Sequence, residues 1–198
     1  MFSEKILNKI EKNLKYNDLT FLGSGDNGEA YKTESGKVIK ITSDKNEFLY
    51  ATRLINNTSE SNIDVYNTIE GNDRLYIIME EINTDSNIED LFNELYNIYT
   101  YFNDIDTILD IDLEEVENQD IFISNESKKM LEDLIESSLF YEKIGIPSYA
   151  LDIQPDNIGI KNNGKYILFD QRNMFLNPDM VQNEINKENI KRKKMKIT

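Results

Sequence analysis

The chain has 198 residues and a formal net charge of -15, and it contains neither cysteine nor histidine. Without cysteine there is no disulfide framework and no thiolate chemistry, which fits a reducing compartment. Without histidine, acid, base and metal-binding roles fall to carboxylates, amides, lysine and hydroxyls. The acidity argues against a nucleic-acid-binding protein, because phosphate backbones attract clustered lysine and arginine.

The charge is uneven along the chain. Residues 187–198, KENIKRKKMKIT, hold six positive groups and one negative group. We expect a solvated tail there, with a docking arm for an acidic partner as the alternative. The N-terminus is charged and amphipathic, unlike a signal peptide, and no apolar run approaches the roughly 20 residues that span a bilayer. We therefore expect no membrane partner.

The predicted elements begin with a short helix over Ser3–Lys15, whose apolar residues recur at helical spacing. From Leu19 to Thr42 the period changes to two, with turns at Gly23–Gly28 and Ser35-Gly36, which predicts three antiparallel strands. A helix over Asp44–Asn56 follows, because its apolar residues share one face.

Two further strands are predicted at Ile63–Glu70 and Arg74–Glu81, joined by the hairpin signal Gly71-Asn72. The first part of the chain therefore reads as a five-stranded antiparallel sheet with one helix after the third strand. The second part is mainly helical. Helices are predicted from Ser86 to about Phe102 and from Asn125 to Gly145, the latter with Ser124 or Asn125 as N-cap and Gly145 as terminator.

Between these two helices lies the acidic segment NDIDTILDIDLEEVENQD, residues 103–120. Its aspartates resemble a calcium loop only superficially, since no glycine stands at the sharp turn and the spacing is wrong, so we interpret it as a solvated acidic face. After the second helix, SYALDIQPDNIGI and KYILFD predict two short strands around a turn at Asn162–Gly164. The fold class is α+β.

Three features carry possible chemistry, each weak alone. The stretch LGSGDNGEAY has glycines in G-x-G-x-x-G spacing, but it continues as a strand from Glu29 to Thr33, which excludes a dinucleotide-binding turn into a helix. Alone, it reads as an ordinary hairpin. Lys40 in KVIKIT alone reads as a surface lysine, and Glu47 near a helix start alone reads as dipole compensation.

Together these features resemble the small lobe of the protein kinase-like fold, and the resemblance covers roughly residues 20–173. It implies that the turn Gly23, Ser24, Gly25 and Gly28 covers nucleotide phosphates, that Ala30 lies above the adenine ring, and that Lys40 is the strand-three lysine. Glu47 is the best candidate for the partner of Lys40. Glu60 is the alternative, disfavoured because it lies beyond the predicted helix end.

The second half continues the resemblance. YALDIQPDNIGI is similar to the family's catalytic loop H-R-D-L-K-P-E-N, with Asp152, Pro155 and Asn157 at the matching positions. YILFDQRN places Asp170 where the D-F-G aspartate belongs. The resemblance implies that Asp152 orients the acceptor hydroxyl and accepts its proton, and that Asn157 and Asp170 hold Mg²⁺.

The resemblance also implies ATP as the nucleotide. The strand LYIIMEEI ends where the family's hinge lies, so backbone groups from Glu80 to Ile82 would read the adenine, with Met79 at the back of the pocket. Backbone amides approach phosphate oxygens most easily where side chains are absent, and a positioned cation neutralises them.

Several family positions differ. Ala150 and Leu151 replace the histidine and arginine before the catalytic aspartate, and Gln154 replaces a lysine that steadies the transferred phosphate. D-F-G reads Asp170-Gln171-Arg172, and Arg172 is interpreted as a salt-bridging residue rather than a phosphate ligand. Only 28 residues follow Asp170, which leaves no room for a peptide-docking platform.

We therefore expect a minimal, two-lobed kinase-like domain over residues 1–198, with an N-lobe of about 1–82 and a reduced, mainly helical C-lobe of about 83–198. The predicted function is Mg²⁺-dependent transfer of the γ-phosphate of ATP to a hydroxyl of a protein or a small molecule. A cytoplasmic location is expected, in a bacterial cell or in a host if the chain is phage-encoded. The alternatives are a pseudokinase-like binding module and nucleotidyl transfer.

Overall fold

The computed structural model describes residues 19–25, 28–55, 57–71, 74–84, 87–101, 111, 114, 124–146, 154–169 and 183–187, with the backbone alone at 97–101. The predicted helix Ser3–Lys15 lies outside these residues, as do most of the acidic segment 103–120 and, apart from Lys187, the basic segment 187–198. The chain divides into two compact units. Unit 1 comprises residues 1–55, 64–81 and 178–198, and unit 2 comprises residues 56–63 and 82–177.

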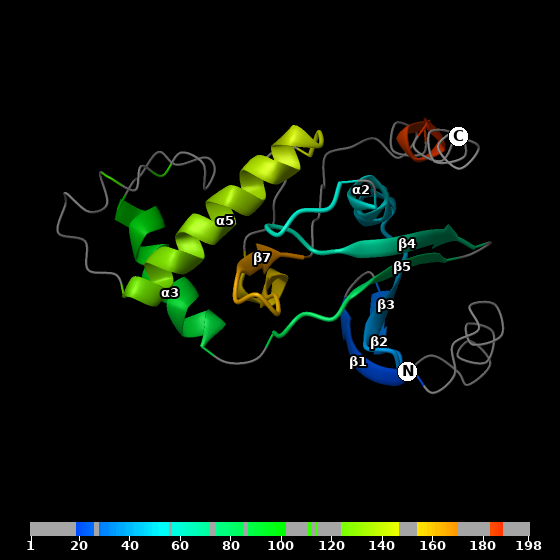
Figure 1. Ribbon diagram of the computed structural model, residues 1–198, viewed down its shortest axis with the longest axis horizontal. Coiled ribbons are helices and arrows are strands. Elements are labelled where there is room, and N and C mark those ends of the chain that lie inside the picture. Colours follow the sequence, from blue (N-terminus) through cyan, green and yellow to red (C-terminus); the bar gives the residue numbers. More distant parts are fainter. Residues whose placement is uncertain are drawn as a thin grey trace. The chain divides into compact units, whose positions relative to one another are not determined.

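Unit 1 contains a five-stranded antiparallel sheet, as predicted, in the order β1-β2-β3-β5-β4. Its elements are β1 (Thr20–Gly25), β2 (Gly28–Lys32), β3 (Lys37–Thr42), α2 (Lys45–Leu54), β4 (Val65–Glu70) and β5 (Leu75–Glu80) (Figure 1). Gly36 takes a positive φ of 72° in the turn between β2 and β3, a conformation that favours glycine. The α+β class is thus confirmed.

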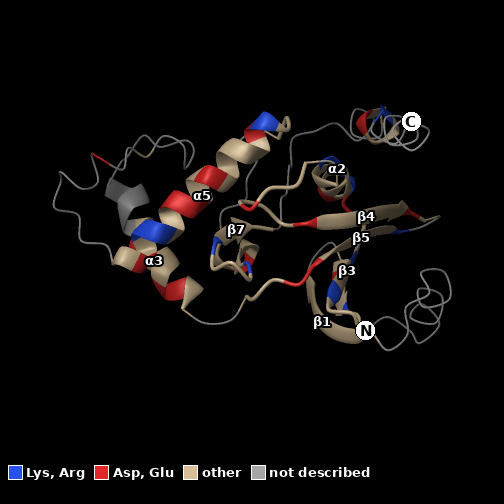
Figure 2. Cartoon of the chain, in the orientation of Figure 1, with Lys and Arg blue, Asp and Glu red and all other residues tan. Residues whose placement is uncertain are grey.

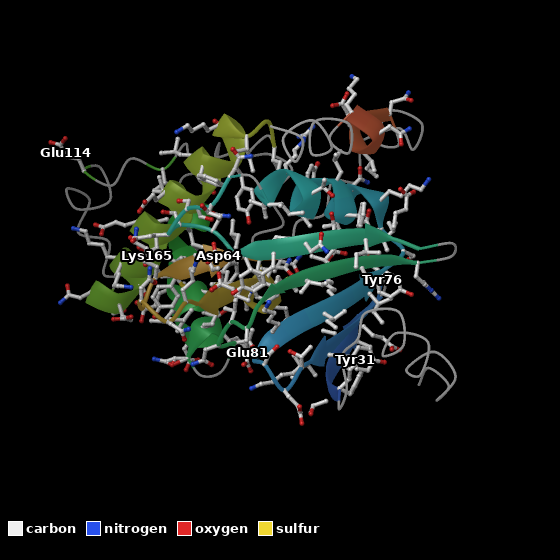
Figure 3. All side chains as sticks on the ribbon, turned by 45° about the vertical axis from the view of Figure 1, so that its right-hand side comes forward. Tyr31, Asp64, Tyr76, Glu81, Glu114 and Lys165 are labelled. Carbon is white, nitrogen blue, oxygen red and sulfur yellow. The ribbon has the colours of Figure 1, made fainter. Side chains whose placement is uncertain are left out.

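One face of this sheet carries an apolar cluster of Tyr31, Ile39, Ile41 and Ile78, against which Tyr76 packs (Figure 3). These residues share a face because Tyr31 pairs with Ile39 and Ile39 pairs with Ile78, and directly paired residues of antiparallel strands point to the same side. Burial raises the pKa of Tyr31 to about 12, and its hydrogen bond to Glu29 adds to the effect. The phenol is therefore neutral at physiological pH.

The other face is covered by α2. Asp44 caps the helix by accepting a hydrogen bond from the Asn46 amide at 2.7 Å. Farther along, the Thr52 hydroxyl lies 3.1 Å from the Thr68 hydroxyl of β4. The buried side chains of α2 include Phe48, Leu49, Tyr50 and Leu54. The helix is thus fixed to the sheet by apolar burial and by a buried hydroxyl pair.

Unit 2 contains α3 (Ile88–Tyr101), α5 (Asn125–Lys143), the 3-10 turn η3 (Pro155–Asn157) and the hairpin β6 (Ile158–Ile160) and β7 (Tyr166–Leu168). Ser124 caps α5, and Gly145 follows its end with a φ of 83°, both as predicted. The core of the unit joins α5 to the hairpin through Leu131, Leu134, Tyr141, Ile158, Ile167 and Leu168, all fully buried. The Tyr141 hydroxyl also donates to the Leu168 carbonyl at 2.8 Å.

The loop 56–63, which joins α2 to β4, is held by α5 and by the hairpin. Ser61 donates to the Glu136 carboxylate, which also accepts from Lys165 at 2.8 Å, and the Lys161 ammonium donates to the Asn62 carbonyl at 2.8 Å. The Lys165 bond, followed by the Ser61 bond, lowers the pKa of Glu136. These bonds join the loop to the other elements of unit 2.

Candidate functional site

The β1–β2 hairpin carries the predicted phosphate-covering glycines. The two strands pair up to Gly25 opposite Gly28, with Ser24 opposite Glu29, and the tip residues Asp26 and Asn27 lie outside the described residues. A Cβ atom added to Gly28 would overlap with the Ile41 carbonyl, so close packing on β3 explains this glycine. A Cβ atom at Gly23 or Gly25 would meet nothing within 4 Å. Packing therefore does not account for these two glycines.

Ala30 and Lys40 lie side by side on the sheet. Ala30 pairs with Lys40 across β2 and β3, and Lys40 pairs with Ile77 across β3 and β5. All three side chains therefore project from the face that α2 covers, with Cβ atoms of neighbours about 5 Å apart. A small side chain, a cation and an apolar side chain thus form one row across the sheet.

Lys40 forms an ion pair with Glu47, its predicted partner. The Lys40 Nζ lies 2.6 Å from the Glu47 Oε1, and the side chains are 18% and 10% exposed. The Asp44 cap starts α2 so that Glu47 falls in its first turn, and the short connection from β3 is sufficient. Glu60 lies beyond the end of α2 at Leu54, in the loop that belongs to unit 2.

The end of β5 is the predicted base-reading segment. Met79 is buried and pairs with Val38. The Glu80 amide donates to the Asp64 carbonyl at 2.9 Å, and the Glu80 carboxylate accepts from the Asp64 amide at 2.7 Å. Glu81, labelled in Figure 3, pairs with Lys32 at 2.6 Å. Because the Glu80 amide already donates to the Asp64 carbonyl, a purine would have to bind to other backbone groups of this segment.

In unit 2, Asn157 lies at the junction of η3 and β6. The Asn157 residue is 8% exposed, its amide donates to the Gln154 carbonyl at 2.9 Å, and its carbonyl accepts from the Phe169 amide at 3.0 Å. Gln154 itself is exposed. The hairpin thus ties the backbone of Asn157 to that of Phe169.

Asp152 and Asp170, the predicted catalytic and metal-binding aspartates, lie outside the described residues. Among the residues that the structure does describe, no three acidic side chains gather as a metal site. An amide oxygen and a carboxylate oxygen, the pair that Asn157 and Asp170 would provide, are ligands suited to Mg²⁺. The chemistry of this donor set fits the expected metal.

Two contacts were not predicted. A Cβ atom at Gly159 would overlap with the Ile82 side chain, and Asn83 exchanges two hydrogen bonds with Ile160. A signal for the first exists in the sequence, because an isolated glycine between β-branched residues, as in Ile-Gly-Ile, marks a close approach of another chain segment. The approaching segment itself has no such signal.

Comparisons with known proteins add no family: no protein-family model matches this chain, and no curated protein matches it. Within the described part of the chain, none of the helices combines the length and the apolarity needed to cross a membrane.

Proposed function

We propose that the chain is a minimal, two-lobed kinase-like enzyme of the cytoplasm that transfers the γ-phosphate of ATP to a hydroxyl, with Mg²⁺. The observation that carries the proposal is the Lys40–Glu47 ion pair at 2.6 Å, next to Ala30 and on the same sheet as an open glycine hairpin. A lysine held by a carboxylate is a fixed cation, and phosphoryl transfer requires mainly positioning and charge neutralisation.

In this proposal units 1 and 2 are the N-lobe and the C-lobe. Lys40 neutralises phosphate oxygens of ATP, and Asn157 and Asp170 would hold Mg²⁺, which would neutralise further phosphate charge. The oxygen of the acceptor hydroxyl bonds to the γ-phosphorus, and Asp152 accepts the proton that this hydroxyl loses. The bond between that phosphorus and the bridging oxygen breaks, and ADP leaves with the electron pair. Gln154 offers the transferred phosphate a hydrogen-bonding amide in place of a charge.

The first prediction concerns transfer itself. Purified protein incubated with γ-labelled ATP and Mg²⁺ should label itself, a lysate protein or a small hydroxyl compound. Asp152→Asn should reduce the rate about a hundredfold or more, because a positioned base contributes roughly that factor. Lys40→Met should abolish labelling. Lys37→Met is the matched control, since Lys37 is on the same strand but lies over the Tyr66 ring, 4.7 Å from its centroid.

The transferase proposal is wrong if the parent protein labels nothing. It is also wrong if Asp152→Asn labels at the same rate as the parent protein. The replacement of a charged residue by Gln154 favours one second candidate, a pseudokinase-like module that binds nucleotide without turnover. A thermal shift with ATP and Mg²⁺ separates the two. Binding without labelling supports the module, whereas no binding contradicts both functions.

A further inference from the structure

The segment after β5 is attached to β6 of the β6–β7 hairpin by an isolated antiparallel bridge. The Asn83 amide donates to the Ile160 carbonyl at 3.2 Å, and the Ile160 amide donates to the Asn83 carbonyl at 2.9 Å. This reciprocal pair of bonds is the pattern of neighbouring antiparallel strands. The position of Ile82, one residue earlier, is therefore coupled to β6.

Gly159, next to Ile160, makes this attachment possible. It is buried, and its backbone does not take a positive φ. A Cβ atom there would overlap with the Ile82 Cγ2 and would lie 3.4 Å from both the Ile82 Cβ and the Asn83 carbonyl oxygen. The requirement for glycine is thus one of space, because the Ile82 side chain fills the volume that a side chain at 159 would need.

We propose that Gly159 is a positioning residue for the nucleotide base, and this inference depends on the proposed function. By leaving room for Ile82, Gly159 sets the position of Glu81 and Ile82, whose backbone offers donors and acceptors to the edge of the purine. The Ile82 side chain, only partly buried, offers an apolar surface to the face of the purine. The role proposed for Gly159 therefore concerns the base and not the phosphates.

The test uses the full chain and two probes, ATP and inorganic tripolyphosphate, each with Mg²⁺, titrated calorimetrically. Gly159→Ala should weaken ATP binding about tenfold, because one added methyl group in a packed site displaces its neighbours. Tripolyphosphate lacks a base, so its affinity should change less than about twofold. Ile82→Ala combined with Gly159→Ala should bind ATP as well as Ile82→Ala alone, since Ile82→Ala removes the overlap.

Gly164→Ala is the control for a purely structural effect. Gly164 lies in the turn of the same hairpin with a φ of 80°, and a Cβ atom there would meet nothing within 4 Å. This variant should lower the melting temperature and leave the ratio of the ATP and tripolyphosphate affinities unchanged.

Three results would overturn the inference. If the parent protein binds ATP and Gly159→Ala binds it equally well, Gly159 does not position the base, and the proposed function is unaffected. A parallel loss of ATP and tripolyphosphate affinity in Gly159→Ala means a structural role only. If the parent protein does not bind ATP, both the proposed function and this inference are wrong.

Discussion

Two ion pairs of unit 1 have the same length and different surroundings. Lys40–Glu47 and Lys32–Glu81 both measure 2.6 Å, but the first pair is 18% and 10% exposed and the second is 41% and 39% exposed. Solvent screens exposed charges, so an ion pair at the surface contributes little to stability. A less exposed pair leaves a poorly solvated charge behind when one partner is removed.

We therefore expect Glu47→Gln to lower the free energy of unfolding by about 1–2 kcal/mol, between the surface and the fully buried case. Glu81→Gln, the matched control, should stay within about 0.5 kcal/mol of the parent protein. Urea unfolding at neutral pH measures both values. If the two substitutions change the free energy of unfolding equally, burial does not make the Lys40–Glu47 pair more important for stability than the exposed Lys32–Glu81 pair.

At the scale of elements, α5 is capped twice at its N-terminus. The Ser124 hydroxyl accepts from the Ser127 amide at 3.1 Å. Glu94 of α3 adds a second layer, because its carboxylate accepts from the Ser124 amide at 2.8 Å and from the Ser127 hydroxyl at 2.7 Å. The Ser124 amide, and after it the Ser127 hydroxyl, lowers the pKa of Glu94 below its ordinary value of 4.5. One carboxylate thus links two helices.

This geometry predicts a pH dependence of stability. A carboxylate whose pKa is lower in the folded state stabilises the fold above its unfolded pKa of about 4.5, and this stabilisation is lost as the pH falls through the folded value. Glu94→Gln should therefore be less stable than the parent protein at pH 7, and the difference should narrow below about pH 4.5. Urea unfolding at pH 7 and at steps down to about pH 3 measures it.

Glu89→Gln is the control for this pH series, since Glu89 is an exposed glutamate in the first turn of the same helix. At pH 7 its difference from the parent protein should be smaller than that of Glu94→Gln, because an exposed charge contributes little to stability. A Glu94→Gln difference that is constant across the pH range would mean that the bonds to Ser124 and Ser127 do not depend on the carboxylate charge.

The elements also show which features the sequence could predict. Strand period, turn residues and the Ser124 cap are local signals, so the sheet, α2, α5 and the β6–β7 hairpin could all be predicted. The Lys40–Glu47 pair could be predicted only from the resemblance to the kinase-like fold, since each residue alone indicates an ordinary surface role. The contact of Gly159 with Ile82 could not, because it joins segments far apart in the chain, and packing between such segments leaves no periodic signal.

At the scale of the whole molecule, the formal charge of -15 acts on any polyanionic ligand. Acidic side chains are spread over the described parts of both units, including α3 and α5 (Figure 2). A net field of this sign would repel ATP, and salt would screen this repulsion beyond about one Debye length. Mg²⁺ reduces the repulsion because it neutralises part of the charge of ATP.

The last prediction follows from this repulsion. The association rate constant of Mg²⁺-free ATP should rise roughly threefold between about 20 and 200 mM salt, because screening weakens the repulsion. The rise should be smaller for the Mg²⁺ complex, which carries fewer negative charges, and absent for adenosine, which carries none. Stopped-flow binding measures all three constants. A rate constant that falls with salt would mean that a local positive field, and not the net charge, governs the approach of ATP.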